Sequence, residues 1–197
     1  MPSRSRIRLG EGRVLQLRVE LEGIVPVVWR RLEVSGRASL HELHGVIQRA
    51  LGPDADGGYH FDIDGVRYVD PDEDALPGRE ADNVSLESLA LHTGARFTHV
   101  AEHHGDPWRH IVTLEQVSPR LVGQRLPACI AGGRAAPPDE CSGPDAYREL
   151  LSALRDPLDP RAAELRSWLP DQFDPEYVNV TTINARLAKV PKHRPAA

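Results

Sequence analysis

The chain has 197 residues, with 24 lysines and arginines against 29 aspartates and glutamates, which gives a formal net charge of −5. The stretch from Asp70 to Asp82 contains six carboxylates and one arginine and accounts for this whole excess. Because the rest of the chain is balanced, bulk neutralisation of nucleic-acid phosphates and binding to anionic membranes are not expected. No run of about 18 apolar residues and no apolar signal segment occurs, so the expected compartment is the cytoplasm.

Several enzyme classes are also excluded. The two lysines, Lys189 and Lys192, are both close to the end of the chain, whereas a P-loop or a Schiff-base enzyme needs a lysine inside its site. The glycine-rich dinucleotide turn, the nucleophile elbow and the His-Glu-x-x-His zinc helix are absent. Cys129 and Cys141 are too few for a disulfide scaffold or a four-thiolate zinc site, and we expect both to be reduced.

The beginning of the chain predicts two strands and a helix. Residues 1–13 are expected to form a flexible arm. Apolar and polar residues alternate from Leu15 to Leu21, which predicts a strand with one buried face. A second strand is expected from Val28 to Val34, and a capping box opens a helix expected from Ser39 to Leu51.

The middle of the chain predicts a hairpin and an acidic loop. Asp64-Gly65 is a strong turn signal between strands expected at Tyr59–Ile63 and Val66–Val69. The stretch from Asp70 to Asp82 has no hydrophobic period and contains two prolines, which predicts a mobile surface loop. A short helix is expected near Ser85 to Ala90.

Strands dominate the first two-thirds of the sequence and helices the last third. Another antiparallel pair is expected at Arg96–Val100 and Trp108–Val117, and the strand pattern stops beyond Pro119. Three helices are then expected, at residues 144–154, 162–169 and 175–187. Residues 191–197 are expected to form a disordered tail. This order predicts an α+β fold, with helices packed on a mostly antiparallel sheet, in a single domain spanning 14–190.

Three segments, in this order, carry a family resemblance. They are Pro26-Val27-Val28-Trp29-Arg30-Arg31 with Leu40-His41-Glu42-Leu43-His44, then Gly105-Asp106-Pro107-Trp108-Arg109-His110, then Pro137-Pro138-Asp139-Glu140-Cys141-Ser142-Gly143. Together they resemble the root-inducing-plasmid ORF-three-like family, which includes a passenger protein of an insertion element. The resemblance runs from about Val14 to Leu187. It implies one compact α+β domain and an association with mobile elements, but no established reaction.

The chain departs from the family pattern at two motifs. Glu102-His103-His104 stands where the family has Tyr-Asp-Phe, and Ala136 replaces the first cysteine of its Cys-Pro-Pro motif. The resemblance therefore implies a divergent member, and the function has to be argued from the residues.

Our leading hypothesis is a non-catalytic interaction or accessory module for an unknown protein or small ligand. Its binding surface would combine the mouth of the Trp108–His110 hairpin, including Asp106, with Trp29-Arg30-Arg31. An aromatic ring beside guanidinium groups can stack on a base and hold phosphate. The alternative for Trp29 is a core residue flanked by ion-paired arginines, which we favour because aromatic residues are scarce.

A hypothesis from another class is a metal-dependent hydrolase or nuclease. Asp106, His110 and His60 would hold one divalent metal ion, joined by His103 and His104. This hypothesis expects the Asp106 and His110 side chains within about 4 Å of each other, with His60 in the same hollow. The alternative for these residues is a turn-capping aspartate and a core histidine.

A DNA recombination accessory role is the last hypothesis. It is weak, because none of the nine histidines has an arginine three residues later, as a tyrosine recombinase needs.

Two more groups allow a functional and a structural interpretation. On the first helix, we expect His44 to pack at the edge of the apolar stripe and His41 to be solvated. Near Pro137 to Gly143, a helix N-terminus could bind an anion or activate Cys141, but the neighbouring carboxylates favour a buried thiol.

Overall fold

The structure, a computed structural model, describes residues 8–52, 57–72, 77–102, 106–156, 158–169 and 173–190. The strands within these ranges are β1 (Leu9–Leu21), β2 (Trp29–Ser35), β3 (Tyr59–Ile63), β4 (Val66–Val69), β5 (Arg79–Glu80), β6 (Arg96–Ala101), β7 (Trp108–Leu121) and β8 (Ala128–Gly133). The helices there are α1 (Leu40–Leu51), α2 (Pro144–Arg155), α3 (Ala162–Trp168), α4 (Val180–Leu187) and the 3-10 helix η1 (Leu86–Leu89).

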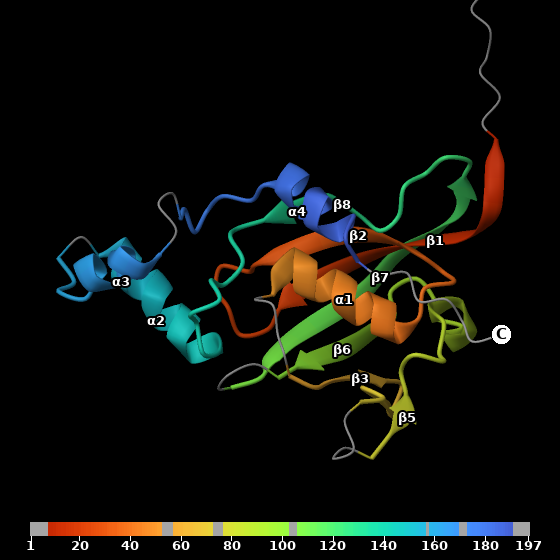
Figure 1. The fold of residues 1–197 in the computed structure, drawn as a ribbon, viewed down its shortest axis with the longest axis horizontal. Coiled ribbons are helices and arrows are strands. Elements are labelled where there is room, and N and C mark those ends of the chain that lie inside the picture. The colour runs from red at the N-terminus through yellow and green to blue at the C-terminus, as the bar shows by residue number, and fades with distance from the viewer. Residues whose placement is uncertain are drawn as a thin grey trace, which may run out of the picture.

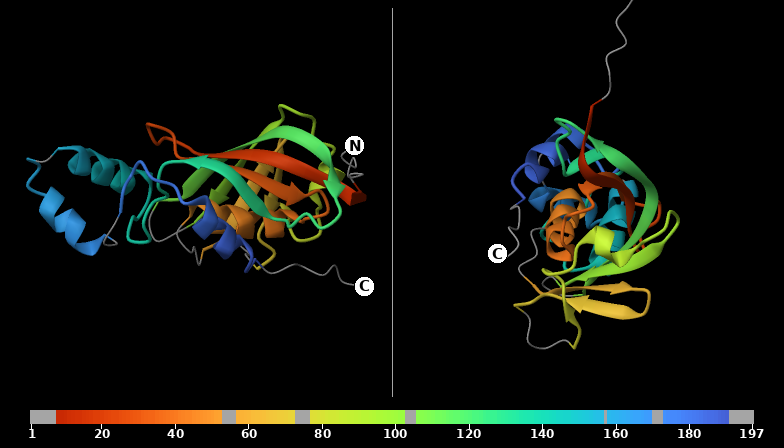
Figure 2. Two further views of the ribbon diagram at one scale, coloured as in Figure 1. Left: turned by 90° about the horizontal axis from the view of Figure 1, so that it is seen from above. Right: turned by 90° about the vertical axis from the view of Figure 1, so that its right-hand side faces the viewer.

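One sheet holds all eight of these strands, in the order β5-β4-β3-β6-β7-β1-β2-β8. Neighbouring strands are antiparallel except β4 and β5, which are parallel. Helices α1 and α4 lie on one side of the sheet, while α2 and α3 project beyond its end (Figures 1 and 2). The predicted α+β class is confirmed. Among the described residues, no helix has both the length and the apolar character needed to cross a membrane.

The core lies between the sheet and α1, on what we call the inner face. Along β1 and β2 every second residue points to this face, and Leu17, Val19 and Leu32 are completely buried there. The predicted capping box of α1 is present, because Ser39 Oγ accepts the Glu42 N–H at 3.1 Å and the Glu42 carboxylate accepts the Ser39 N–H at 2.9 Å.

Strand β1 begins earlier than the alternating pattern indicates. Leu9 pairs with Leu121 and Arg13 with Pro119, with an irregularity between them. Residues 9–13, which we expected in a flexible arm, are therefore strand; the rest of that arm, residues 1–7, lies outside the described residues, as does the tail 191–197.

The acidic stretch is more than a surface loop. Its end forms β5, and Ala81 is fully buried with its N–H donated to the Val69 carbonyl at 2.9 Å. The prediction of a mobile loop through Asp82 is thus wrong at this end, because one small side chain and the backbone pack without any hydrophobic period. Residues 73–76 lie outside the described residues.

Strand β8 lies in the stretch between Pro119 and residue 144, where the sequence predicts no strand. Helix α4 begins at Val180, later than the expected start near residue 175. The sequence Ala-Cys-Ile-Ala-Gly-Gly has no alternation, yet it pairs antiparallel with β2. The Asn184 side chain on α4 then bonds to both backbone groups of Cys129, accepting its N–H at 2.8 Å and donating to its carbonyl at 2.9 Å.

Candidate functional site

Three histidines from three elements form a hydrogen-bonded series on the inner face, which we call the histidine relay. His44 Nδ1 on α1 lies 2.9 Å from His99 Nε2 on β6, and His99 Nδ1 lies 3.2 Å from His110 Nδ1 on β7. The strand register places His99 directly opposite His110 and both are completely buried, while His44 is partly buried. The relay thus links the helix to the centre of the sheet.

Tyr59 on β3 joins this cluster. The His44 ring stacks on the Tyr59 ring with centroids 3.9 Å apart, and the Tyr59 hydroxyl lies 2.8 Å from His41 Nδ1. His44 is packed, as expected, whereas His41 is half-buried and bonded to Tyr59 rather than simply solvated.

The relay is uncharged at neutral pH. Burial lowers the pKa of His44 to about 3 and that of His110 to about 4, and it shifts the pKa of His99 well below its ordinary value. A neutral imidazole has one donor and one acceptor nitrogen, so the donors must all point toward His110 or all toward His44. His110 Nε2, at the end of the relay that lies in the sheet, is buried without a hydrogen-bond partner among the described residues.

The expected pair of Asp106 and His110 is not formed. Trp108 and His110 are buried on the inner face, while Asp106 is exposed and its backbone N–H donates to the Ser142 carbonyl at 3.0 Å. Within the described part of the chain, the His110 ring bonds to His99, and no ion pair joins it to Asp106. The hairpin mouth is therefore neither an exposed aromatic surface nor an Asp–His pair.

The three expected metal ligands are also not brought together. The register aligns His60 with Val100 and Arg109, one position away from the row of His99 and His110. Because alternate residues of a strand point to opposite faces, His60 and His110 lie on opposite sides of the sheet. His60 Nε2 instead lies 3.5 Å from an oxygen of Asp62.

Other acidic and sulfur ligands do not replace this set. Among the described residues, no group of three or more His, Cys, Asp or Glu side chains could hold a metal ion. His103, His104 and Gly105 lie outside the described residues.

Trp29 belongs to the outer face of the sheet, opposite the helices. It is half-buried, with Arg18 Cζ 4.2 Å and Arg31 Cζ 5.5 Å from its ring centroid. Arg31 also forms a two-bond ion pair with Glu115, at 2.5 and 2.9 Å. The prediction of a core tryptophan is wrong, because alternation along β2 turns Trp29 outward and turns Arg30 inward.

Arg30 is the buried residue that the sequence reasoning missed. Its side chain is 2% exposed, and four backbone carbonyl oxygens accept its hydrogen bonds. Nε donates to Ala50 at 3.1 Å, and Nη1 donates to Trp29, Gly133 and Arg134 at 2.7 to 3.1 Å. The alternation of the strand could have predicted this burial, because Arg30 stands between Val28 and Leu32 on the apolar face. The adjacent Arg31 made the pair look like two surface charges.

A hollow of about 330 Å³ lies beside Arg30, and we call it the Arg30 cavity. It is lined by Arg30, Ala50, Gly52, Ala135, Ala136, Pro137, Pro138, Asp139, Glu140, Phe173, Tyr177, Val178, Asn179, Thr182, Ile183 and Arg186. Burial lowers the pKa of Arg30 to about 10, so the guanidinium remains a cation at neutral pH. No carboxylate of the described residues forms an ion pair with it.

Cys141 does not provide a reactive thiol. It is 2% exposed, and burial together with the charge of Glu140 raises its pKa to about 12. Cys129 is buried as well, and both cysteines are free. The structural interpretation of Cys141 therefore holds, while Pro137 and Pro138 beside it serve as walls of the Arg30 cavity.

The fold and site define an α+β protein that carries, on the helix-covered face of its sheet, a buried histidine relay and a cavity with a buried arginine in its wall. The chain belongs to the plasmid pRiA4b ORF-3-like protein family, whose model matches residues 13–182. The resemblance seen in the sequence motifs is thereby confirmed.

Two relatives illustrate the breadth of the similarity. The chain is 33% identical over 173 residues to the uncharacterized protein y4hQ of Sinorhizobium fredii (strain NBRC 101917 / NGR234), covering 87% of this chain and 89% of that protein. It also resembles the crystal structure of MM3350 from Methanosarcina mazei Go1, a protein described as of unknown function. That match has a TM-score of 0.77 and 28% identity, and it covers 87% of this chain and 98% of the other.

Proposed function

We propose that this protein is a non-catalytic accessory protein of the mobile-element type that binds a small ligand through an anionic group in the Arg30 cavity. The state of Arg30 supports this proposal. Its cationic side chain is buried, lines the cavity and has no carboxylate partner among the described residues. Because a buried charge is costly unless it is paired, the anionic group of a ligand would complete the site.

The existing contacts of Arg30 fix its position without using all its donors. A guanidinium has five N–H donors, and the hydrogen bonds described for Arg30 come from Nε and Nη1. Nη2 makes no hydrogen bond within the described part of the chain. One acceptor, the Ala50 carbonyl, is at the C-terminal end of α1, where the helix dipole favours a cation. The site is thus prepared for an acceptor that can bind in the plane of the guanidinium.

The polar side chains of the described lining include the carboxylates of Asp139 and Glu140 and the hydroxyls of Tyr177 and Thr182, with no histidine, cysteine, serine or lysine among them. The histidine relay lies elsewhere on the inner face. We also propose the cytoplasm as the compartment, in keeping with two free buried cysteines.

The test is a thermal-shift screen of the full chain. The probes are inorganic phosphate, acetate, benzoate and the twenty L-amino acids in free and N-acetylated form. A ligand at 100 times its Kd should stabilise the fold by about 3 kcal/mol, which corresponds to a rise in Tm of roughly 5–10 °C for a chain of this size.

Two neighbouring threonines on α4 locate the binding. Thr182 lines the cavity, and Thr182→Phe should fill the hollow and abolish the shift without touching the contacts of Arg30. Thr181, also exposed on α4, does not line it, so Thr181→Phe is the matched control and should keep the shift. The proposal fails if no probe raises Tm, or if Thr182→Phe responds like the unmodified protein.

A further inference from the structure

We infer that the ligand of the Arg30 cavity is a small monocarboxylate with an apolar body, such as an aryl or short alkyl carboxylate, rather than a phosphate. This inference rests on the proposed function, since it names the class of ligand for the same site. Three features of the described residues carry it: the single guanidinium nitrogen that remains available, the charge of the lining, and the apolar walls.

One nitrogen of Arg30 is available to a ligand. Nη2 makes no hydrogen bond to the described residues, and it is not among their fully buried polar atoms that lack a partner. Nη2 therefore keeps some accessible surface, and the hollow is the space that Arg30 borders. Its two N–H groups suit the oxygens of one carboxylate, whereas the three terminal oxygens of a phosphate need more donors than this nitrogen has.

The backbone of β8 and of the residue after it holds this guanidinium in place. A Cβ atom at Gly132 would lie 2.9 Å from Arg30 Cδ, so the strand can pass this closely only because glycine is there. Arg134 has a φ of 68°, in the left-handed region, and its carbonyl accepts an Arg30 N–H at 2.9 Å. Because Arg30 is already fixed, little side-chain freedom is lost when an anion binds to it.

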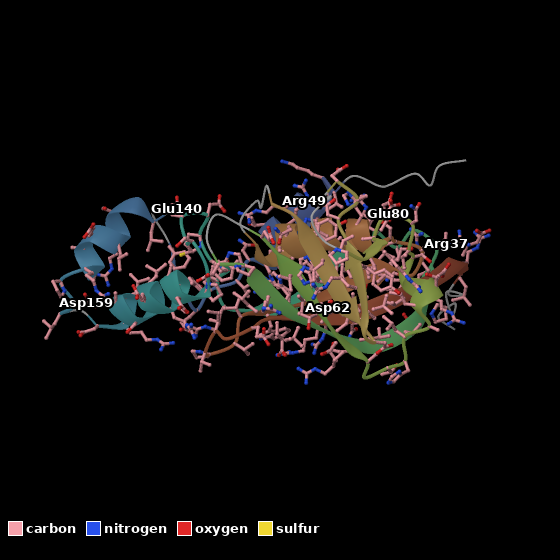
Figure 3. All side chains as sticks on the ribbon, turned by 90° about the horizontal axis from the view of Figure 1, so that it is seen from below. Arg37, Arg49, Asp62, Glu80, Glu140 and Asp159 are labelled. Atoms are coloured by element: carbon pink, nitrogen blue, oxygen red, sulfur yellow. The ribbon has the colours of Figure 1, made fainter. Side chains whose placement is uncertain are left out.

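The charge of the lining favours a single negative charge on the ligand. Arg30 supplies one buried positive charge, which a monocarboxylate would neutralise, whereas a phosphate dianion would leave one negative charge unpaired beside it. The other charged residues of the lining are one arginine, Arg186, and two acidic residues, Asp139 and Glu140. All three are exposed, and Glu140 lies on the loop that leads from the sheet to α2 (Figure 3). Since two of these three charges are negative, they would repel an excess negative charge rather than compensate it.

The walls of the hollow suit an apolar body. Its apolar lining residues come from three separate parts of the chain and are Ala50, then Ala135, Ala136, Pro137 and Pro138, then Phe173, Val178 and Ile183. A ligand that covers these side chains removes apolar surface from water, which a bare inorganic ion cannot do. At about 330 Å³ the hollow is at the small end of the usual range of roughly 300–1,000 Å³ for ligand pockets, so this body is one aromatic ring or a chain of about six carbons.

Ligands with one body and different head groups test the charge requirement. Isothermal titration of the full chain at pH 7.5 is carried out with benzoate, benzamide and phenyl phosphate. These molecules share an aromatic ring but are a monoanion, a neutral molecule and mainly a dianion at this pH. Benzoate should bind at least about tenfold more tightly than either of the other two.

A series of alkyl carboxylates tests the apolar walls. From acetate to butyrate and hexanoate the affinity should rise by about fourfold for each methylene group, because each one buries further apolar surface. Val178→Thr places a hydroxyl in the wall with little change of shape, and it should weaken hexanoate at least about fivefold while leaving acetate unchanged. Val180→Thr is the matched control and should change neither affinity, because Val180 is also half-buried but does not line the hollow.

The outcomes distinguish this inference from the proposed function. If phenyl phosphate binds as tightly as benzoate and Thr182→Phe blocks both, the anion site stands and the monocarboxylate inference is overturned. The inference is also overturned if hexanoate binds no more tightly than acetate, or if Val178→Thr leaves the affinity for hexanoate unchanged. If benzamide binds as tightly as benzoate, or if no probe binds, both fail.

Discussion

Acidification should destabilise this protein well above the pH at which its carboxylates are protonated. The histidine relay is the reason, because His44, His99 and His110 all have a lowered pKa in the folded state. Below pH 6.5 an unfolded chain binds protons that the folded relay excludes, so stability is complete above about pH 6.5 and falls as the pH drops toward 4.

The size of this loss of stability can be worked out for His110, which is completely buried. Its pKa falls from 6.5 to about 4, and at 1.36 kcal/mol per unit this removes about 3 kcal/mol of the free energy of unfolding between pH 6.5 and 4. The other two histidines add in the same direction, up to a combined slope of about 4 kcal/mol per pH unit. If the stability of this chain is near the lower end of the usual range of about 5–15 kcal/mol, acid unfolding is expected near pH 5.

Urea denaturation at a series of pH values between 4.5 and 8 measures this slope directly. His110→Gln should lower the slope by about one proton, or about 1.4 kcal/mol per pH unit. His92→Gln, on an exposed residue, should leave the slope unchanged. A free energy of unfolding that stays constant between pH 6.5 and 5 would refute the reasoning, because it would mean that the relay accepts protons without loss.

Three substitutions test other parts of the structure. Trp29→Ala should cost less than about 2 kcal/mol by urea denaturation, because its ring lies on the outer face with two cation–π contacts; complete unfolding would restore the core interpretation. Asn184→Ala should cost about 1–3 kcal/mol, because both backbone groups of Cys129 lose their partner; an unchanged urea midpoint would contradict this. Ala81→Glu should cost more than about 4 kcal/mol by burying a charge, whereas the neighbouring exposed Glu80→Gln should be neutral; equal midpoints for the two variants would show that Ala81 is not packed.

The local signals of the sequence were sufficient for much of the fold. Alternation located β1 and β2, the capping box located the start of α1, and Asp64-Gly65 adopts the positive φ angles of 48° and 78° that its hairpin turn requires. Strand β8 could not be predicted in this way. Its residues show no alternation of apolar and polar side chains. It forms a strand because its backbone pairs with β2 on one side and because Asn184 hydrogen-bonds to the backbone of Cys129 on the other.

The candidate site was less accessible to sequence reasoning. The relay joins residues 44, 99 and 110, which only strand register and helix placement bring together. His60 seemed to belong with His110 because both are near hairpin ends, but a register difference of one residue places them on opposite faces. Arg30 was treated as a surface residue because its charge outweighed its position in the alternation.

Asn184 has a consequence for how this protein meets other molecules. Strand β8 is one edge of the sheet, and a free edge can recruit a strand from a second copy or from an extended peptide. Here α4 lies along β8 (Figure 1), and its asparagine amide supplies the donor and acceptor that an added strand would offer to Cys129. The opposite edge, β5, is a strand of two residues. At Cys129, therefore, an added strand would first have to displace the Asn184 side chain before it could extend the backbone ladder.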